Sequence, residues 1–314
     1  MDLSCNSIGD SGVNYLSTAL IKLINLSSLS LNFSSNKLIG DSGINYLSTA
    51  LIKLINLSNL SLDLSSNSIG ESGVNYLSTA LIKLINLSSL FLDLSCNSIG
   101  ELGVNYLSTL LIKLVNLSSL SLNLSSNKSI GESSINYLST ALIKLLNLSS
   151  LSLNLSSNKS IGESSINYLS TALIKLINLS SLSLNLSSNK SIEELSINYL
   201  STALIKLINL SSLSLNLEYN SIEESGVNYL STALIKLINL SSLYLNFEEN
   251  SIGDSGVNYL STSLIKLINL SSLYLNFEEN SIGISGVNYL STGLIKLINL
   301  SSLSLNLYDN SIGG

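Results

Sequence analysis

The chain has 314 residues, of which 45% are hydrophobic and only 11% are charged, and its net charge is −6. It contains 14 Lys, 20 Asp or Glu and two Cys, and it has no Arg, His, Pro or Trp. This composition excludes a Ser–His–Asp triad, a His or Cys-rich metal site, an arginine finger and a disulfide framework, because the required residues are missing. We therefore expect no enzyme activity, no catalytic residue, no metal site and no cofactor.

An internal repeat runs along the whole chain. One Asn recurs at intervals of 30 or 31 residues, at Asn6, Asn36, Asn67, Asn97, Asn127, Asn158, Asn189, Asn220, Asn250, Asn280 and Asn310. Each interval of 31 contains one extra Lys directly after this Asn, as in Asn36-Lys37, which lengthens the turn and leaves the next segment intact. Such a fixed period is typical of a solenoid. We expect a single domain over residues 1–314, built from about ten repeats.

The first part of each repeat has a helical pattern. In the first repeat Val13, Leu16, Leu20, Leu23 and Ile24 fall at i, i+3, i+7, i+10 and i+11, which is one face of a helix. Residues of the Val13, Leu16 and Leu20 type should meet the strands in the core. Residues 10 and 11, Asp and Ser, are expected to cap the start of this helix, and residue 25, an Asn, is expected to end it in a left-handed conformation.

The second part of each repeat has the pattern of a strand. Residues 29–33 alternate between apolar and polar side chains, so Leu29, Leu31 and Phe33 should point into the core. Residues 34–36 then turn the chain, and the recurring Asn is expected to bond the backbone of the adjacent repeat there. A repeat of this kind cannot bury its apolar side alone, so stacking should form a parallel sheet inside an arc, with the helices outside.

These residues resemble the leucine-rich repeat family. The resemblance is carried by Leu92-x-Leu94-x-x-Asn97-x-Ile99, and by the Gly-Asp-Ser-Gly-Val and Leu-Ser-Thr-Ala-Leu segments, which occupy residues 9–13 and 16–20 in the first repeat. The latter are similar to the ribonuclease-inhibitor-like subclass, which also forms the sensor arcs of NOD-like receptors and the Ran GTPase-activating proteins. The family implies a curved α/β horseshoe that binds proteins on its concave sheet. Ser89 replaces the usual first Leu of the motif, and the repeats are longer than usual, so we expect a strand or approach segment about two residues longer.

The outward strand positions change character toward the C-terminus. Acidic residues and Lys balance through residue 217, whereas nine acidic residues and three Lys follow it. Tyr is favoured at binding hot spots and carboxylates give charge complementarity. We therefore expect a basic protein to bind an acidic and tyrosine-rich patch. The alternative is an ordinary solvated face, whose shared Tyr and Glu were copied when a repeat was duplicated. The patch comprises Glu218, Tyr219, Tyr244, Glu248, Glu249, Tyr274, Glu278, Glu279, Tyr308 and Asp309.

Other candidate residues have simpler interpretations. Asp63 and Asp93 are neighbours in one column, but nothing else of a metal or acid–base site accompanies them. Cys5 and Cys96 are Ser replacements about 14 Å apart by strand spacing, too far for a disulfide. Nucleic-acid binding is disfavoured by the acidic balance and the lack of Arg.

The expected location is cytoplasmic. The first residues have no signal-peptide pattern, and Lys, Ser and Asn interrupt every apolar run before about 18 residues, so we expect no membrane partner. The leading hypothesis is a non-enzymatic scaffold for protein binding. By resemblance, a GTPase-activating regulatory module or a ligand-sensing arc of a larger receptor are alternatives. The chain begins and ends inside a repeat, so self-association through uncapped ends is also expected.

Overall fold

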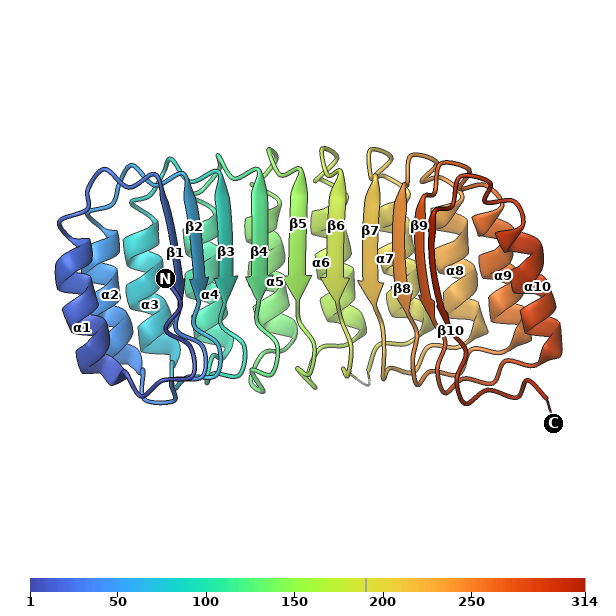
Figure 1. The fold of residues 1–314 in the computed structure, drawn as a ribbon, viewed down its shortest axis with the longest axis horizontal. Coiled ribbons are helices and arrows are strands. Elements are labelled where there is room, and N and C mark those ends of the chain that lie inside the picture. Colours follow the sequence, from blue (N-terminus) through green and yellow to red (C-terminus); the bar gives the residue numbers. More distant parts are fainter. Residues whose placement is uncertain (190, 314) are drawn as a thin grey trace. The chain divides into compact units, whose positions relative to one another are not determined.

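The computed structural model describes residues 1–189 and 191–313. The chain forms two compact units, Met1–Asn158 and Lys159–Gly314, here called the N-terminal and the C-terminal unit. In both units helices and strands alternate along the chain, one helix and one strand per repeat (Figure 1). This is the order that the change of hydrophobic period within each repeat predicts.

The N-terminal unit contains five helices and five strands within its described residues. They are α1 (Gly9–Leu20), β1 (Ser28–Asn32), α2 (Asp41–Leu51), β2 (Asn59–Asp63), α3 (Glu71–Leu81), β3 (Ser89–Asp93), α4 (Glu101–Leu111), β4 (Ser119–Asn123), α5 (Glu132–Leu142) and β5 (Ser150–Asn154). Successive strands pair in parallel without a shift in register, so that Leu60 lies opposite Leu29 and Leu90. The helices cover one face of the sheet, and the other face is uncovered (Figure 1).

The C-terminal unit repeats this arrangement. Its described elements are α6 (Glu163–Leu173), β6 (Ser181–Asn185), α7 (Glu194–Leu204), β7 (Ser212–Asn216), α8 (Glu224–Leu234), β8 (Ser242–Asn246), α9 (Asp254–Leu264), β9 (Ser272–Asn276), α10 (Ile284–Leu294) and β10 (Ser302–Asn306). Strands β6 to β10 are parallel and pair in chain order. Helices α2 and α6, which follow the inserted Lys37 and Lys159, keep 11 residues, so these insertions affect only the turns, as predicted. The insertion at residue 190 lies outside the described residues.

The strand prediction is confirmed in register and in direction. Leu29, Leu31 and Phe33 are 9%, 2% and 1% exposed, and the intervening Ser30 is exposed. The same alternation continues through both units, with Leu243 and Leu245 buried on either side of the half-buried Tyr244. The core therefore lies between the strands and the helices, and the polar strand positions form the uncovered face of each sheet.

The helix prediction is wrong at its C-terminal end. Helix α1 ends at Leu20, and the next residue, Ile21, is still in the right-handed region. Ile24 is therefore not on the buried helix face: it is 53% exposed, and its equivalents Ile55 and Ile85 are 54% and 59% exposed. The helical spacing of apolar residues extends into a segment that is already a loop. In that loop the spacing no longer decides which side chain faces the core.

Asn25 does not end the helix either. It is absent from the residues with positive φ, and the equivalent Asn in the next repeat, Asn56, donates from Nδ2 to the carbonyl of Ile24 over 2.9 Å. Asn86 bonds the carbonyl of Ile55 in the same way over 3.1 Å. The Asn at this position of the repeat therefore links consecutive repeats within a unit.

The recurring Asn of the turn forms a second bridge, as predicted. The Nδ2 atom of Asn97 donates to the carbonyl of Leu64 in the preceding repeat over 3.0 Å, and to the carbonyls of Leu94 and Ser95 in its own turn. Its Oδ1 atom accepts a hydrogen bond from the backbone N–H of Ile69 over 3.0 Å. The side chain therefore satisfies backbone groups that the end of the strand leaves without partners.

Asp10 caps a helix, but not the helix that contains it. Its Oδ1 atom accepts hydrogen bonds from the backbone N–H groups of Gly40 and Gly43 at the start of α2, over 2.8 and 2.9 Å. Residue 8, an Ile without a capping side chain, precedes α1. The prediction of a local cap is therefore wrong, because stacking brings this carboxylate nearer to the next helix than to its own free N–H groups.

Candidate functional site

Four neighbouring strands of the C-terminal unit form the candidate site. Ser214 of β7, Tyr244 of β8, Tyr274 of β9 and Ser304 of β10 lie directly opposite one another in the register of the sheet. They follow the outward strand positions, so their side chains lie on the uncovered face. The sequence placed both Tyr in the patch, and the structure brings them side by side.

Tyr244 and Tyr274 form a parallel aromatic stack. Their ring centroids are 4.3 Å apart, and the angle between the ring planes is 8°. Burial against the sheet and the neighbouring Tyr274 raise the pKa of Tyr244 to about 12. The carboxylates of Glu218 and Glu248 contribute to the same increase. Tyr244 therefore stays neutral at physiological pH and acts as a flat, polar-edged contact surface.

A row of three glutamates lies two residues beyond the strands. The carboxylate of Glu218 accepts a hydrogen bond from Nδ2 of Asn246 over 3.1 Å. Glu248 and Glu278 accept the same bond from the Asn at the end of the following strand, Asn276 and Asn306, over 3.0 and 2.7 Å. Each of these bonds uses the Oε2 atom of the glutamate, so Oε1 remains open to a further donor.

The backbone of this row is fixed as well. The backbone N–H of Glu248 donates to Oδ1 of Asn246, and the backbone N–H of Glu278 donates to Oδ1 of Asn276. The side chain of each Asn therefore makes two bonds. Its Oδ1 holds the backbone of the glutamate two residues later, and its Nδ2 holds the carboxylate of the glutamate in the preceding repeat. Sequence patterns did not single out these Asn, since the same Asn occurs in most repeats. Only the acidic residue beside it makes it a positioning group.

The negative charge of the row is not neutralised within the patch. Burial raises the pKa of Glu248, and the neighbouring carboxylates of Glu218 and Glu278 raise it further, whereas the hydrogen bond from Asn276 lowers it. At the adjacent turn, the carboxylate of Glu249 raises the pKa of Glu279, and Asp309 adds to this effect. Like charges on adjacent strands repel one another, and no Lys is among the groups that act on Glu248.

A second row follows at the turn, in an unusual backbone conformation. Tyr219, Glu249, Glu279 and Asp309 have φ values of 53°, 48°, 50° and 51°, in the left-handed region. Their backbones continue the ladder, because the N–H of Tyr219 bonds the carbonyl of Glu248, and the N–H of Glu249 bonds the carbonyl of Glu278. The repeat fixes this conformation, since Ser or Cys occupies it in earlier repeats, for example at Ser66 and Cys96.

The structure places all ten predicted patch residues in three neighbouring rows. The Tyr pair lies on β8 and β9, Glu218, Glu248, Glu278 and Tyr308 form the second row, and the left-handed residues form the third. The side-chain interaction with Glu249 is the largest cause that raises the pKa of Tyr219 to about 12. Tyr308, which follows β10, is 69% exposed.

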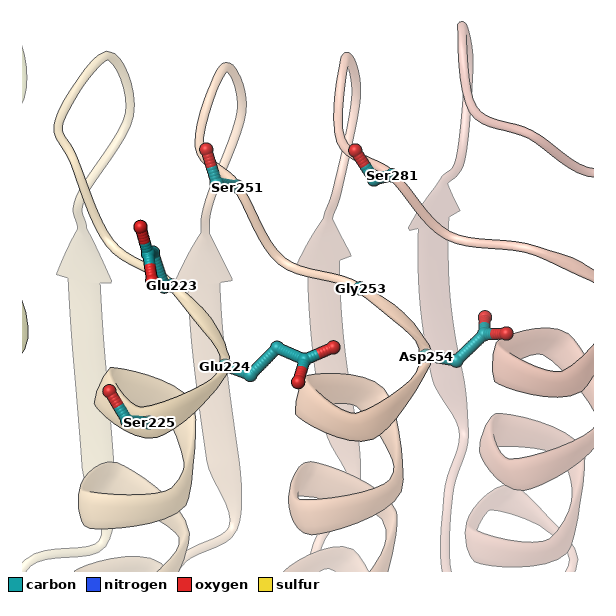
Figure 2. A pocket seen from close by; sticks show the side chains of 7 residues that line it. All are labelled: Glu223, Glu224, Ser225, Ser251, Gly253, Asp254 and Ser281. Atoms are coloured by element: carbon teal, nitrogen blue, oxygen red, sulfur yellow. The ribbon is translucent and has the colours of Figure 1, made fainter.

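A separate acidic hollow lies on the helix side of the same unit. It has a volume of about 650 Å³ and is lined by Glu223, Glu224, Asp254 and small residues at the starts of α8 and α9 (Figure 2). Figure 2 shows the three carboxylates spread over successive repeats and not converging on one point. Within the described part of the chain, no three His, Cys, Asp or Glu side chains are grouped so that they could hold a metal ion.

The two other sequence candidates lie in the N-terminal unit. Asp63 and Asp93 are opposite one another in the register of β2 and β3, as expected. Each accepts bonds from the Ser two residues later, and Asp93 also accepts a bond from Nδ2 of Asn123 over 2.8 Å. Their hydrogen bonds are therefore those of the turn itself. The thiols of Cys5 and Cys96 are free and exposed.

Comparisons with known proteins found two similarities. A family model described as Leucine Rich repeat matches residues 1–17 and 29–48. A solved structure, the crystal structure of the Rad7 and Elc1 complex in yeast, is similar to 95% of this chain and 77% of that chain, with 22% sequence identity and a TM-score of 0.47. No curated protein matches this sequence.

The repeated helix–strand units with parallel, in-register strands define a leucine-rich repeat fold of the solenoid type. The ribonuclease-inhibitor-like subclass stays a prediction. In residues 1–189 and 191–313, every helix is too short or too polar to cross a lipid bilayer.

Proposed function

We propose that the chain is a non-enzymatic protein-interaction scaffold, and that it binds a basic segment of a partner protein across β7–β10. The observation that carries this proposal is the glutamate row, in which the Asn of each following strand holds one carboxylate over 2.7–3.1 Å. Burial and the neighbouring carboxylates of Glu218 and Glu278 both raise the pKa of Glu248. The leucine-rich repeat fold supports the general role, because its regular strands present an extended, solvated surface.

The charges of the glutamate row affect the free energy of both the unbound and the bound protein. Holding Glu218, Glu248 and Glu278 in one row costs free energy in the unbound protein, since like charges directly opposed on neighbouring strands are destabilising. A cationic side chain placed against the row removes this repulsion and also gains attraction. The Asn hydrogen bonds fix the carboxylates before binding, so little additional ordering is needed. We therefore expect the affinity for basic segments to fall steeply as the salt concentration rises.

The test uses a defined probe, a fluorescent 12-residue peptide of alternating Lys and Ser, titrated with the 314-residue chain. One variant combines Glu248→Lys, Glu249→Lys, Glu278→Lys and Glu279→Lys. The control variant reverses four acidic residues at the helix starts, Glu101→Lys, Glu132→Lys, Glu163→Lys and Glu194→Lys, and so has the same net charge.

The proposal expects the patch variant to weaken binding at least about tenfold, which is about 1.4 kcal/mol, and the control to weaken it much less. Circular dichroism of both variants shows that the helices and strands are retained. Equal affinities for the two variants would show that only the net charge of the protein attracts the peptide, and the proposed site would be wrong.

We also propose that residues 1–314 behave as one domain, on the basis of the unbroken repeat. The support is that no linker or change of composition interrupts it. Unfolding in urea, followed both by circular dichroism and by Tyr fluorescence, should then give coincident transitions. Two separate transitions would contradict a single cooperative domain.

A further inference from the structure

The Tyr244–Tyr274 stack has two outer ring faces, and both are bordered by a small residue. On the β7 side, the position opposite Tyr244 is Ser214, and on the β10 side, the position opposite Tyr274 is Ser304. Ser ends at its hydroxyl, whereas a Tyr ring extends well above the sheet. Each outer ring face therefore stands beside an open position, here called a slot, which has a Ser at its floor; beyond Ser214 the next position, Ser183 of β6, is also small.

The stack itself shows what fits into such a slot. One strand spacing separates Tyr274 from Tyr244, and it accommodates a flat ring in face-to-face contact, with centroids 4.3 Å apart. A planar group of similar thickness above Ser214 or Ser304 would extend the stack by one member. Among protein side chains, the guanidinium of Arg is planar, cationic and known to stack on aromatic faces, and Lys shares only the charge.

A carboxylate lies at each slot. Glu218 lies two residues beyond the end of β7, the strand of Ser214, and its carboxylate accepts a hydrogen bond from Asn246 of β8, the strand of Tyr244, over 3.1 Å. At the other slot, the carboxylate of Glu278 leans toward β10, where it accepts a hydrogen bond from Asn306 over 2.7 Å. In both glutamates the Asn bond uses Oε2, which leaves Oε1 to accept a guanidinium N–H.

We propose that these two slots bind two arginine side chains of one extended segment of the partner. This inference rests on the proposed function and specifies the residues that the basic segment carries. One Arg stacks on the outer face of Tyr244 and donates to Glu218, and the other stacks on the outer face of Tyr274 and donates to Glu278.

The spacing of the slots sets the spacing of the two arginines. Ser214 and Ser304 are three strands apart, which is about 14 Å at the usual strand separation. In an extended chain, residues i and i+4 point to the same side and are about 13–14 Å apart. Residues i and i+3 point to opposite sides, and residues i and i+2 are only about 7 Å apart. The recognised pattern is therefore Arg-x-x-x-Arg in an extended conformation.

Three 13-residue peptides of otherwise identical sequence test this pattern. The first has Arg at positions i and i+4, the second has Arg at i and i+3, and the third has Lys at i and i+4. We expect the first to bind at least about tenfold more tightly than either of the others. Equal affinity for the Arg and Lys peptides at the same spacing would overturn the stacking slots, and equal affinity for the two Arg spacings would overturn the two-point geometry.

Variants of the protein locate the slots. Ser214→Tyr fills the first slot with a ring from the protein itself, and Ser304→Tyr fills the second, so each should abolish the preference for the first peptide over the second. Tyr259→Leu, on the surface of α9, is the control for a change of an aromatic residue elsewhere, and it should leave the preference unchanged. If both Ser variants keep the preference, the slots are not where Arg binds.

The outcomes separate this inference from the proposed function. If the alternating Lys–Ser peptide binds and the charge-reversal variant loses it, while the three new peptides bind alike, the basic-segment site stands and the arginine slots are wrong. If none of the peptides binds to the folded chain, both proposals are wrong.

Discussion

The backbone N–H of Ile69 donates a hydrogen bond to Oδ1 of Asn97, over 3.0 Å and across 28 residues of chain. The same bond recurs between Ile252 and Asn280, over 2.9 Å. It is missing at Asn67, whose Oδ1 has no partner. In the preceding turn the inserted Lys37 makes Ile39 the equivalent of Ile69, and the N–H of Leu38 bonds the carbonyl of Asn36 within the lengthened turn.

This difference makes Asn97 and Asn67 a matched pair. Both donate from Nδ2 to three backbone carbonyls, but only Asn97 also accepts from a buried N–H. We predict that Asn97→Ala lowers the free energy of unfolding more than Asn67→Ala does, by about 1–3 kcal/mol, because it leaves the N–H of Ile69 without a partner. Urea unfolding of the two variants measures the difference, and equal losses would contradict this role of Oδ1.

Asp254 caps the last helix from the preceding one. Its Oδ1 atom accepts bonds from the N–H groups of Gly283 and Gly286, over 2.7 and 2.8 Å. We predict that Asp254→Ala destabilises the start of α10 by about 1 kcal/mol, the usual effect of losing an N-terminal cap. Amide hydrogen exchange should then be faster at residues 283–287.

Glu224 provides the control for this prediction. It holds the same position in α8, and its Oε1 atom lies beside Gly253 at the start of α9, but no hydrogen bond between the two is found among the described residues. Glu224→Ala should therefore change exchange at the start of α9 much less. A comparable increase for both variants would mean that negative charge near the helix start, and not the hydrogen-bonded cap, is what stabilises it.

Two tyrosine hydroxyls of the patch should ionise only at a higher pH than an ordinary Tyr does. The pKa of Tyr219 and that of Tyr244 are raised to about 12, by Glu249 and by burial respectively. An absorbance titration at alkaline pH should show a late step for these two tyrosines, which Tyr219→Phe and Tyr244→Phe each reduce. We expect Glu249→Gln to lower the pKa of Tyr219, and Glu279→Gln to leave it unchanged, since Glu279 is not among the groups that raise it.

The glutamate row should make stability depend on pH. The pKa of Glu248 is raised in the folded state, so the folded protein binds this proton more tightly than the unfolded chain does. The ionised Glu248 therefore destabilises the folded protein. This destabilisation is fully present above the raised pKa and disappears as the pH falls below the ordinary pKa of Glu. Glu248→Gln removes one charge and keeps a similar shape, and should raise the melting temperature at pH 7 by about 1–2 °C.

The sign of the pH effect is the sharper measurement. The gain from Glu248→Gln should shrink as the pH is lowered toward 4, where the wild-type carboxyl is itself protonated. A gain that stays constant from pH 7 to pH 4 would show that packing and not charge repulsion is responsible.

Sequence patterns predicted the strands well and the end of the helix poorly. Leu29, Leu31 and Phe33 alternate with polar residues, and a two-residue period leaves one choice of buried face. Ile24 matches the helical spacing but lies beyond the end of α1 at Leu20. Spacing alone does not show where a helix stops, and no Pro or Gly marks the end in this repeat.

The details of the candidate site were harder to predict than its membership. The sequence placed Tyr244 and Glu248 in one patch, because both depart from the Ser of most other repeats. The left-handed backbone at Glu249 had no signal in the sequence, since it is a property of the repeat and not of the residue, and Ser66 has it as well. The Asn–Glu bonds could not be predicted either, because they join strands of neighbouring repeats.

The sequence by itself determined the repeat, the alternation of helix and strand, and the polar face of each sheet, since these depend on local periodicity within about 30 residues. Only the tertiary structure decided that Asp10 caps α2 and not α1, and that Asn246 holds the carboxylate of Glu218. The physical reason is that both contacts depend on how closely consecutive repeats stack. The pattern within one repeat fixes which residues face its neighbour, but the distance and angle between their atoms result from packing.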